Sequence, residues 1–183
     1  MLVPFAIHRI RTLCWTTFYR LTYRLFFASM GPGCVFEGWI DMPQRSGKIY
    51  LGSRVRICRL VEMSVPQGGV LRIGHGTLLS RGVLLSVHGE TVIGNNVMIA
   101  EYSFLHDNDH QFSDIDQPIV SQGMIAGKIT VGDGSWIGAN SIVLRGAVIG
   151  HDSIVGAGSV VKKAHDPGSI IVGVPGKAIR RRW

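Results

Sequence analysis

Aliphatic residues recur at every sixth position in the second half of the chain. From residue 131 the sequence reads VGDGSW, IGANSI, VLRGAV, IGHDSI and VGAGSV. Glycine follows the aliphatic residue in four of these five units, and the fifth position is always serine or alanine. The repeated aliphatic positions are Val131, Ile137, Val143, Ile149, Val155 and Val161.

A period of six predicts a coil of short strands joined by tight corners. An ordinary strand alternates every two residues and a helix repeats every 3.6, whereas a β-sandwich shows turns at intervals of about 8 to 12 residues. In a coil, one aliphatic side chain per unit points inward, a small residue fits the corner, and glycine supplies a backbone with positive φ. Stacked coils pair their strands in parallel and bury a continuous aliphatic column. The pattern therefore predicts an all-β protein.

The same pattern appears upstream in a less regular form. It is visible in IGHGTL from Ile73, LSRGVL from Leu79 and IGNNVM from Ile93, with a weaker turn at 51–55. We therefore expect the coil to run from about residue 45 to 163, inside a domain of residues 31–183. The polar stretch LHDNDHQFSD interrupts the pattern, and it predicts an excursion loop over residues 105–128.

Residues 1–30 predict a basic amphipathic helix. Four arginines and no acid occur in the first 36 residues. These arginines exclude a membrane-spanning helix and the uncharged core of a signal peptide. Two interpretations remain open: the helix caps the coil, or it lies on an anionic membrane surface. The expected apolar face is formed by Ile7, Ile10, Cys14, Phe18, Leu21 and Leu25, opposite Arg9, Thr16, Arg20 and Arg24.

Composition narrows the class of protein. A length of 183 residues suits one domain, and a hydrophobic content of 46% excludes a disordered chain. The cysteines, Cys14, Cys34 and Cys58, are odd in number and lack C-x-x-C spacing, which is typical of reduced cysteines in a cytosolic protein. The net charge of +7 suits nucleic acid, anionic lipid or an anionic cofactor, and composition does not choose among them.

The polar loop has three interpretations. Its charges could simply solvate it, its histidines and carboxylates could bind zinc, or a histidine beside a carboxylate could act as a general base. The sequence resembles a family at this point. The hexads, together with VGDGSWIGAN, IVGAGSVV and VGVPGKAIR, are similar to the left-handed parallel β-helix of hexapeptide-repeat acyltransferases. The galactoside, maltose and polysaccharide O-acetyltransferases are the most similar members.

This resemblance implies a cytoplasmic homotrimer that transfers acetyl directly from acetyl-CoA to a carbohydrate hydroxyl, with active sites between subunits. It implies no metal and no nucleic-acid partner. Residues 1–30 would add peripheral contact with the inner face of the cell membrane. Counting eleven residues from Ile99 assigns the general base to His110, with Asp107 or Asp109 to orient it. The resemblance places the acceptor beside His106, Ser80 and His88, and the departure at Ser80 and His88 from the family's asparagine and acid favours a polysaccharide or glycan precursor.

The resemblance also implies the contacts with coenzyme A. Small corner residues would meet the pantetheine arm, Trp136 would wall the cleft, and cations would meet the phosphates. The expected cofactor residues are Trp136, Ala139, Gly156, Ala157, Lys162, Lys163, Lys177 and Arg180.

Two alternatives remain. A metal enzyme similar to the gamma-type carbonic anhydrases would combine His106 and His110 with His75 or His88, although only three residues separate the first pair where that family has four. A non-catalytic β-helix could also serve as a glycan-binding scaffold.

Overall fold

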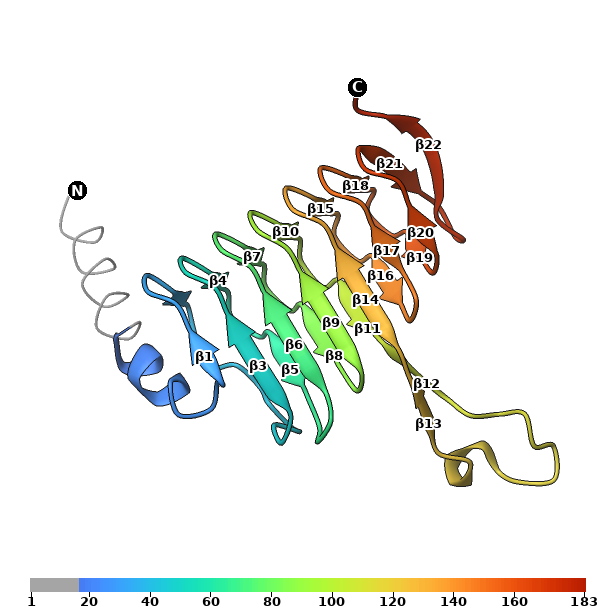
Figure 1. The fold of residues 1–183 in the computed structure, drawn as a ribbon, viewed down its shortest axis with the longest axis horizontal. Coiled ribbons are helices and arrows are strands. Elements are labelled where there is room, and N and C mark those ends of the chain that lie inside the picture. The colour runs from blue at the N-terminus through green and yellow to red at the C-terminus, as the bar shows by residue number, and fades with distance from the viewer. Residues whose placement is uncertain (1–16) are drawn as a thin grey trace, which may run out of the picture.

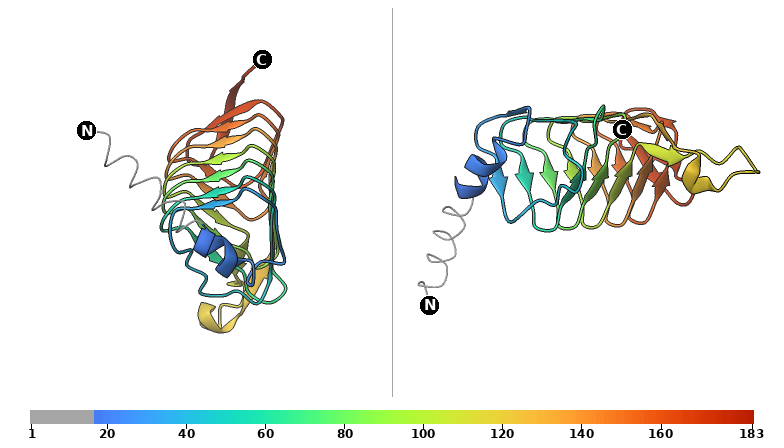
Figure 2. Two further views of the ribbon diagram at one scale, coloured as in Figure 1. Left: turned by 90° about the vertical axis from the view of Figure 1, so that its left-hand side faces the viewer. Right: turned by 90° about the horizontal axis from the view of Figure 1, so that it is seen from below.

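A computed structural model of the protein describes residues 17–183. Short strands stack into one column, with a helix at the amino-terminal end and one long excursion projecting from the carboxy-terminal half (Figures 1 and 2). The first part of the helix predicted over residues 1–30 lies outside the described residues. Residues 17–23 are helical.

Three parallel sheets form the sides of the column, and the chain passes through sheets A, B and C in turn, except that the first and last coils have no strand in sheet C. Sheet A contains β1 (Ser29–Met30), β3 (Lys48–Leu51), β6 (Val70–Ile73), β9 (Glu90–Ile93), β14 (Lys128–Val131), β17 (Val148–Ile149) and β20 (Ala164–His165). Sheet B contains β2 (Val35–Phe36), β4 (Arg56–Ile57), β7 (Leu78–Leu79), β10 (Met98–Ile99), β15 (Trp136–Ile137), β18 (Ile154–Val155), β21 (Ser169–Val172) and the antiparallel β22 (Lys177–Arg181). Sheet C contains β5 (Glu62–Ser64), β8 (Leu84–Ser86), β11 (Phe104–His106), β16 (Ile142–Leu144) and β19 (Val160–Val161).

The coil is longer than the hexads predict. It begins at β1 and continues through β21, whereas the sequence pattern suggests residues 45 to 163. In the first coil Gly31 takes the second position after Met30, and Phe36 and Ile40 are buried at positions that continue the inner column. Burial of an apolar side chain is enough to extend the stack there, because the neighbouring coil already supplies the hydrogen-bonding edge.

The repeated aliphatic residues form the core. Within a sheet, register pairs place Leu79, Ile99, Ile137 and Val155 in one inward row, and each is fully buried. Sheets A and C contribute similar rows. Together they make the continuous aliphatic column that the period of six predicts.

The glycine at the second position of each hexad is required by close packing rather than by positive φ. A Cβ built on Gly138 would lie 2.6 Å from the backbone nitrogen of Ala157 in the next coil. Positive φ occurs instead at the fourth position, for example 66° at Gly134 and 55° at Asn140. The expected positive-φ glycines are therefore present at the fourth position, as at Gly134, Gly146 and Gly158.

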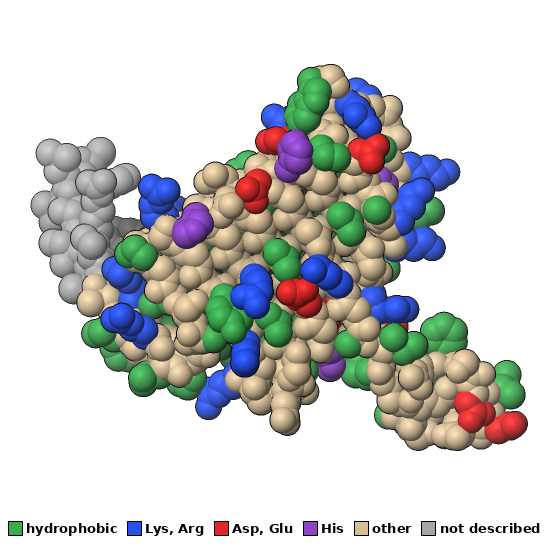
Figure 3. Space-filling model, in the orientation of Figure 1, with side chains coloured by type: hydrophobic (Ala, Val, Ile, Leu, Met, Phe, Trp, Pro, Cys, Tyr) green, Lys and Arg blue, Asp and Glu red, His purple; other side chains and the backbone are tan. Residues whose placement is uncertain are grey.

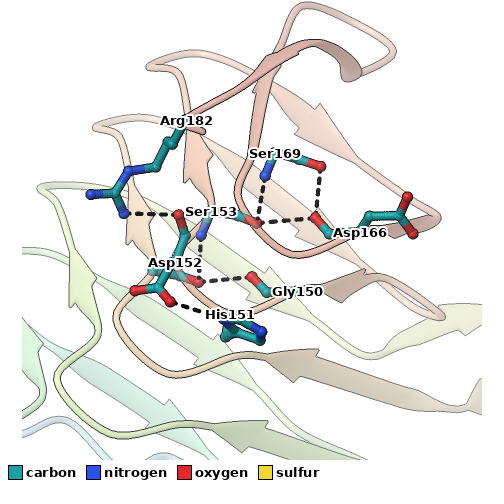
Figure 4. A network of polar contacts seen from close by, with 8 residues as sticks. Gly150, His151, Asp152, Ser153, Asp166, Ser169 and Arg182 are labelled. Atoms are coloured by element: carbon teal, nitrogen blue, oxygen red, sulfur yellow. Dashed lines mark hydrogen bonds and ion pairs between the residues drawn. The ribbon is translucent and has the colours of Figure 1, made fainter.

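The small residues at the fifth position do more than fit a tight corner. The Ser135 hydroxyl donates to the Gly150 carbonyl at 3.0 Å, and the Ser141 hydroxyl donates to the Gly156 carbonyl at 3.0 Å. Figure 4 shows the same arrangement one coil later, where the Ser153 hydroxyl donates to the Asp166 carbonyl at 3.3 Å. These buried hydroxyls tie each coil to the next through carbonyls that lie at the corners.

The helix caps the first coil with one aromatic face. Tyr19, Tyr23 and Phe27 are buried, and the Tyr23 ring lies 5.0 Å from the Phe36 ring. The backbone nitrogen of Ile40 donates to the Tyr23 hydroxyl at 2.6 Å. The capping interpretation therefore holds for the described part of the helix.

The excursion is a two-stranded antiparallel ribbon with a loop at its tip. The strands are β12 (Asn108–His110) and β13 (Met124–Ala126), and a short 3-10 helix, η1 (Ile119–Ser121), lies between them. Leu105 and His106, which the sequence places in the excursion, belong to β11 and pair with both neighbouring coils. The chain leaves the column at Asp107 and rejoins it at Lys128.

Candidate functional site

His110 stands on the outgoing strand of the excursion. It is the last residue of β12, it is opposite Met124 of β13, and its side chain is exposed. The corner from which the excursion leaves lies between sheets C and A. A histidine in this place is open to a ligand that approaches the side of the column.

Asp107 anchors the root of the excursion and is fully buried. Its carboxylate accepts the backbone N–H of His88 at 2.7 Å and that of Gly89 at 3.2 Å, and it accepts the Thr91 hydroxyl at 3.1 Å. Strand register makes Asp107 the equivalent of the buried Val65 and Val87 in the two preceding coils. The carboxylate therefore points into the column, where it accepts hydrogen bonds from the backbone N–H groups of His88 and Gly89. A valine side chain could not accept them.

Asp109 is held by a residue of the next coil. Arg145 Nε donates to Asp109 Oδ2 at 2.6 Å. The stem of Arg145 also crosses the returning strand, since a Cβ on Gly127 would lie 2.5 Å from Arg145 Cγ. Arg145 thus contacts Asp109, which precedes His110, and Gly127, which follows the returning strand at the root of the excursion. Within residues 17–183, no hydrogen bond joins Asp107 or Asp109 to His110.

His106 lies at the base of the excursion, half-buried on sheet C between Ser86 and Leu144. Burial lowers its pKa below the ordinary value of 6.5, the charges of Asp109 and Asp107 raise it, and His88 and His110 lower it again. The net direction is downward, so the imidazole is neutral at pH 7. The buried Nδ1 of His106 has no hydrogen-bond partner among the described residues.

Two residues of the site, Asn108 and Arg145, are not predicted from the sequence. Asn108 is fully buried, and its side-chain amide donates to the Ser86 hydroxyl at 3.1 Å. Its side-chain carbonyl has no partner in the described part of the chain. The hexad pattern stops at this loop, so periodicity gives no signal for Asn108. Arg145 occupies the third position of the hexad VLRGAV, where the residue type varies from unit to unit.

The acceptor-side residues are only partly brought together. His88 and His110 both contribute to the electrostatics at His106. Ser80 lies at the opposite end of β8, at the corner between sheets B and C. Within one chain, Ser80 is therefore separated from the histidines by the whole width of sheet C.

The predicted metal alternative is not supported by the placement of the histidines. His75 lies at the corner between sheets A and B, where its Nδ1 accepts the Ser53 backbone N–H at 2.9 Å. Across residues 17–183, no group of three or more His, Cys, Asp or Glu side chains is arranged to hold a metal ion.

Trp136 and Arg180 lie in one outward row of sheet B. Register pairs Trp136 with Ile154, Ile154 with Ile170, and Ile170 with Arg180. Three strand spacings separate the two ends of the row, which corresponds to about 14 Å. Trp136 is 45% exposed, so this row offers an apolar surface that ends in a cation.

Small residues interrupt the corner between sheets B and C. The third residue of the hexad lies in this corner. It is Arg81 or Glu101 in earlier coils, and Ala139 or Ala157 in later coils. The N–H of Gly158 donates to the Ala139 carbonyl at 2.9 Å. Gly156 precedes Ala157 in the same corner. The backbone is therefore exposed where the resemblance places the pantetheine arm.

Three of the four predicted cations share one pocket at the carboxy-terminal end of the column. The pocket has a volume of about 570 Å³ and is lined by Lys163, Lys177 and Arg180. Lys162 is exposed but does not line it. Asp166 and Arg181 also line the pocket and form an ion pair of 2.7 Å. Its remaining positive charge suits a ligand with several phosphates.

His165 closes the floor of this pocket. Register places it after Ile149 in the inward row of sheet A, where earlier coils have aliphatic residues. Burial lowers the pKa of His165, the charge of Lys163 lowers it further, and Asp166 partly opposes both.

Comparison with known proteins agrees with this geometry. The model of the bacterial transferase hexapeptide family (six repeats) matches residues 128–163. A probable acetyltransferase of Mycobacterium tuberculosis is 36% identical over 62% of this chain and 38% of its own length. Galactoside O-acetyltransferase of Escherichia coli is 31% identical over 62% of this chain and 55% of its own length. The predicted resemblance to hexapeptide-repeat acyltransferases is confirmed.

Solved structures confirm the fold as well. A variant of AntD, an N-acyltransferase from Bacillus cereus in complex with dTDP-4-amino-4,6-dideoxyglucose and coenzyme A, superimposes with a TM-score of 0.77. It is 26% identical, and the match covers 90% of this chain and 89% of that one. A hexapeptide-repeat acetyltransferase from Vibrio cholerae in complex with acetyl coenzyme A matches 86% of this chain and 73% of that one, with a TM-score of 0.63 and 22% identity. The predicted left-handed parallel β-helix is the fold of this chain.

The chain spans about half or less of the length of the curated relatives that it matches.

Proposed function

We propose that the protein is an acetyl-CoA-dependent O-acetyltransferase that acts on a carbohydrate hydroxyl. The observation that carries the proposal is the position of His110, which is exposed on a strand clamped to the column by Arg145. The row from Trp136 to Arg180 and the basic pocket supply the cofactor surface on the same column. The relatives' names and the solved complexes support the acyl donor and a sugar acceptor.

In this proposal His110 acts as a general base. A neutral imidazole nitrogen takes the proton of the acceptor hydroxyl as its oxygen attacks the thioester carbonyl, which forms the new C–O bond. Backbone N–H groups stabilise the oxyanion. Collapse of the intermediate breaks the C–S bond, and the proton passes from His110 to the departing thiolate. Direct transfer needs no nucleophilic serine or cysteine.

The other residues of the proposed site either bind the cofactor, position the base or contact the acceptor. Lys163, Lys177 and Arg180 contact the phosphates of coenzyme A, while Trp136 borders the thioester end. Arg145 is a positioning residue, since it acts on His110 only through Asp109 and the returning strand. His106 contacts the acceptor, and its lowered pKa keeps a neutral ring beside the base.

We further propose that the enzyme is a homotrimer with its active sites between subunits. The outward row of sheet B is apolar, with Met98 49% exposed and Trp136 45% exposed. A neighbouring subunit whose excursion covered this row would bring its own His110 toward Trp136 and toward the corner between sheets B and C, where Ser80 lies. Equilibrium sedimentation of the chain at micromolar concentration tests the trimer directly.

Acetyl transfer is tested by incubating the protein with acetyl-CoA and a panel of oligosaccharides and amino sugars. Free coenzyme A is measured with a thiol reagent, and mild alkali separates a labile O-ester from a stable amide. His110→Ala should lower kcat by roughly 10² to 10⁴ with little change in the KM for acetyl-CoA. His106→Ala should have a milder effect.

A matched pair of lysines tests the cofactor surface. Lys163→Ala should raise the KM for acetyl-CoA more than Lys162→Ala, because only Lys163 lines the pocket. If only a stable amide forms, the protein is an N-acyltransferase and not an O-acetyltransferase. An active His110→Ala variant with an inactive His106→Ala variant would show that His106 is the base, and failure to bind acetyl-CoA would refute the proposal.

A further inference from the structure

The amino-terminal helix has a second apolar face, which is largely exposed. Tyr19, Tyr23 and Phe27 form the buried face. Leu21 and Leu25 are 66% and 84% exposed. They are on the face that the sequence predicts to be apolar, so this face of the helix is not the one that caps the coil.

Two aromatic side chains extend this exposed face. Phe18 is 48% exposed and Trp39 is 59% exposed. Their rings meet edge to face with centroids 6.2 Å apart. The four side chains Phe18, Leu21, Leu25 and Trp39 are called the apolar stripe below. Large apolar groups gathered at the end of a molecule mark an interaction surface.

Basic residues lie next to the apolar stripe. A pocket of about 370 Å³ between the helix and the first coil is lined by Arg20, Arg24 and Leu21, together with Thr17, Met30, Gly31 and Pro32. Among residues 17–183, no acidic residue lines it. The first acid of the chain is Glu37. In Figure 3 the described surface at this end of the molecule shows basic and hydrophobic side chains, whereas acidic ones lie nearer the middle, the carboxy-terminal end and the excursion.

We propose that this end of the protein docks on an anionic membrane surface. The apolar stripe enters the boundary between headgroups and acyl chains, where leucine and tryptophan are stable. Arg20 and Arg24 then contact lipid phosphates. Within the described part of the chain no carboxylate lines the pocket, so both guanidinium groups are available for an anion, and a bilayer supplies a plane of anions beside an apolar layer.

A second copy of the chain fits this surface less well. A symmetric contact would bring two pairs of Arg20 and Arg24 together without an acid to compensate them. The net charge of +7 per chain adds to the repulsion. Membrane docking also stands independently of the proposed acetyl transfer, because none of the residues of the apolar stripe belongs to the site around His110.

The test uses the full chain and vesicles of phosphatidylcholine, with or without phosphatidylserine, in a sedimentation assay. The intact protein should bind the phosphatidylserine vesicles at 20 mM salt and release as salt rises to about 0.3 M, because the Debye length then falls to a few ångströms. Arg20→Gln with Arg24→Gln should weaken binding roughly thirtyfold, at about fivefold for each arginine. Leu21→Gln with Leu25→Gln should weaken it roughly tenfold or more.

The matched control is Leu60→Gln with Arg81→Gln, which removes an exposed leucine and an exposed arginine from a corner of the column. This control should bind like the intact protein, and thermal melts should show that all variants fold. The proposal is overturned if the intact chain ignores anionic vesicles at low salt, or if it binds neutral vesicles equally well. It is also overturned if the leucine variants change the oligomeric mass without changing vesicle binding.

Discussion

Replacing Asp107 tests whether a buried carboxylate stabilises the root of the excursion. Its side chain is fully buried and accepts hydrogen bonds from two backbone N–H groups and one hydroxyl. Asp107→Ala leaves these donors without an acceptor in a place that water does not reach. A buried donor that loses its partner costs about 1–3 kcal/mol.

The structure gives a different magnitude for each substitution. The Thr91 hydroxyl can rotate to another acceptor, so the two backbone donors dominate, and Asp107→Ala should cost about 3–5 kcal/mol. Asp107→Asn keeps one oxygen for the His88 and Gly89 N–H groups and should cost about 1 kcal/mol, the difference between charged and neutral acceptors. Asp107→Val restores the volume found at Val65 and Val87 but not the acceptor, so it should resemble the alanine variant more than the asparagine variant.

Thermal melting at one fixed protein concentration measures these effects, because association makes the melting temperature depend on concentration. A loss of 3–5 kcal/mol corresponds to a fall in Tm of roughly 10 °C for a domain of this size. Asp114→Ala, an exposed aspartate of the same excursion, is the control and should change stability by less than about 0.5 kcal/mol. If Asp107→Ala melts within 2 °C of the intact protein, or if Asp107→Asn is as damaging as Asp107→Ala, the hydrogen bonds are not what stabilises this corner.

Three further predictions follow from other contacts. Ser141→Ala removes the donor to the Gly156 carbonyl and should lower the free energy of unfolding by about 1 kcal/mol; urea denaturation measures it, and no change would show that the hydroxyl only fills space, as Ala147 does. His165 has a pKa below 6.5 in the folded protein. The stability that the neutral imidazole contributes is therefore fully present above pH 6.5. It is lost as pH falls toward the folded pKa, because the unfolded chain then binds more protons than the folded one. His165→Leu should remove this acid sensitivity, and equal losses of Tm between pH 7 and 5 in both proteins would contradict it. Arg145→Ala should lower the kcat for acetyl transfer roughly tenfold or more, with stability changed by less than about 1 kcal/mol because the ion pair is exposed; Arg145→Lys should recover part of kcat, and an unchanged kcat would remove Arg145 from a positioning role.

The period of six by itself determined the architecture of this protein. An inward side chain at every sixth residue needs only local spacing to define a strand, a corner and a face, so Val131 to Val161 predict the column before any contact is known. The polar interruption likewise predicts an excursion near its observed place. Both features are readable because each depends on the order of neighbouring residues along one chain, whereas the choice of His110 within the excursion needs the family resemblance as well.

Only the tertiary structure decided what the residues around that pattern contact. Asp107 resembles a catalytic carboxylate in the sequence, yet register with Val65 and Val87 places it inside the column. Arg145 reaches the excursion from a later coil, across 36 residues of sequence. The helix has two apolar faces, and the periodicity of Leu21 and Leu25 does not show that Tyr23 is the side chain that packs on Phe36. In each case a side chain is assigned by the surface that a distant strand presents to it, and the spacing of residues along the chain does not contain that surface.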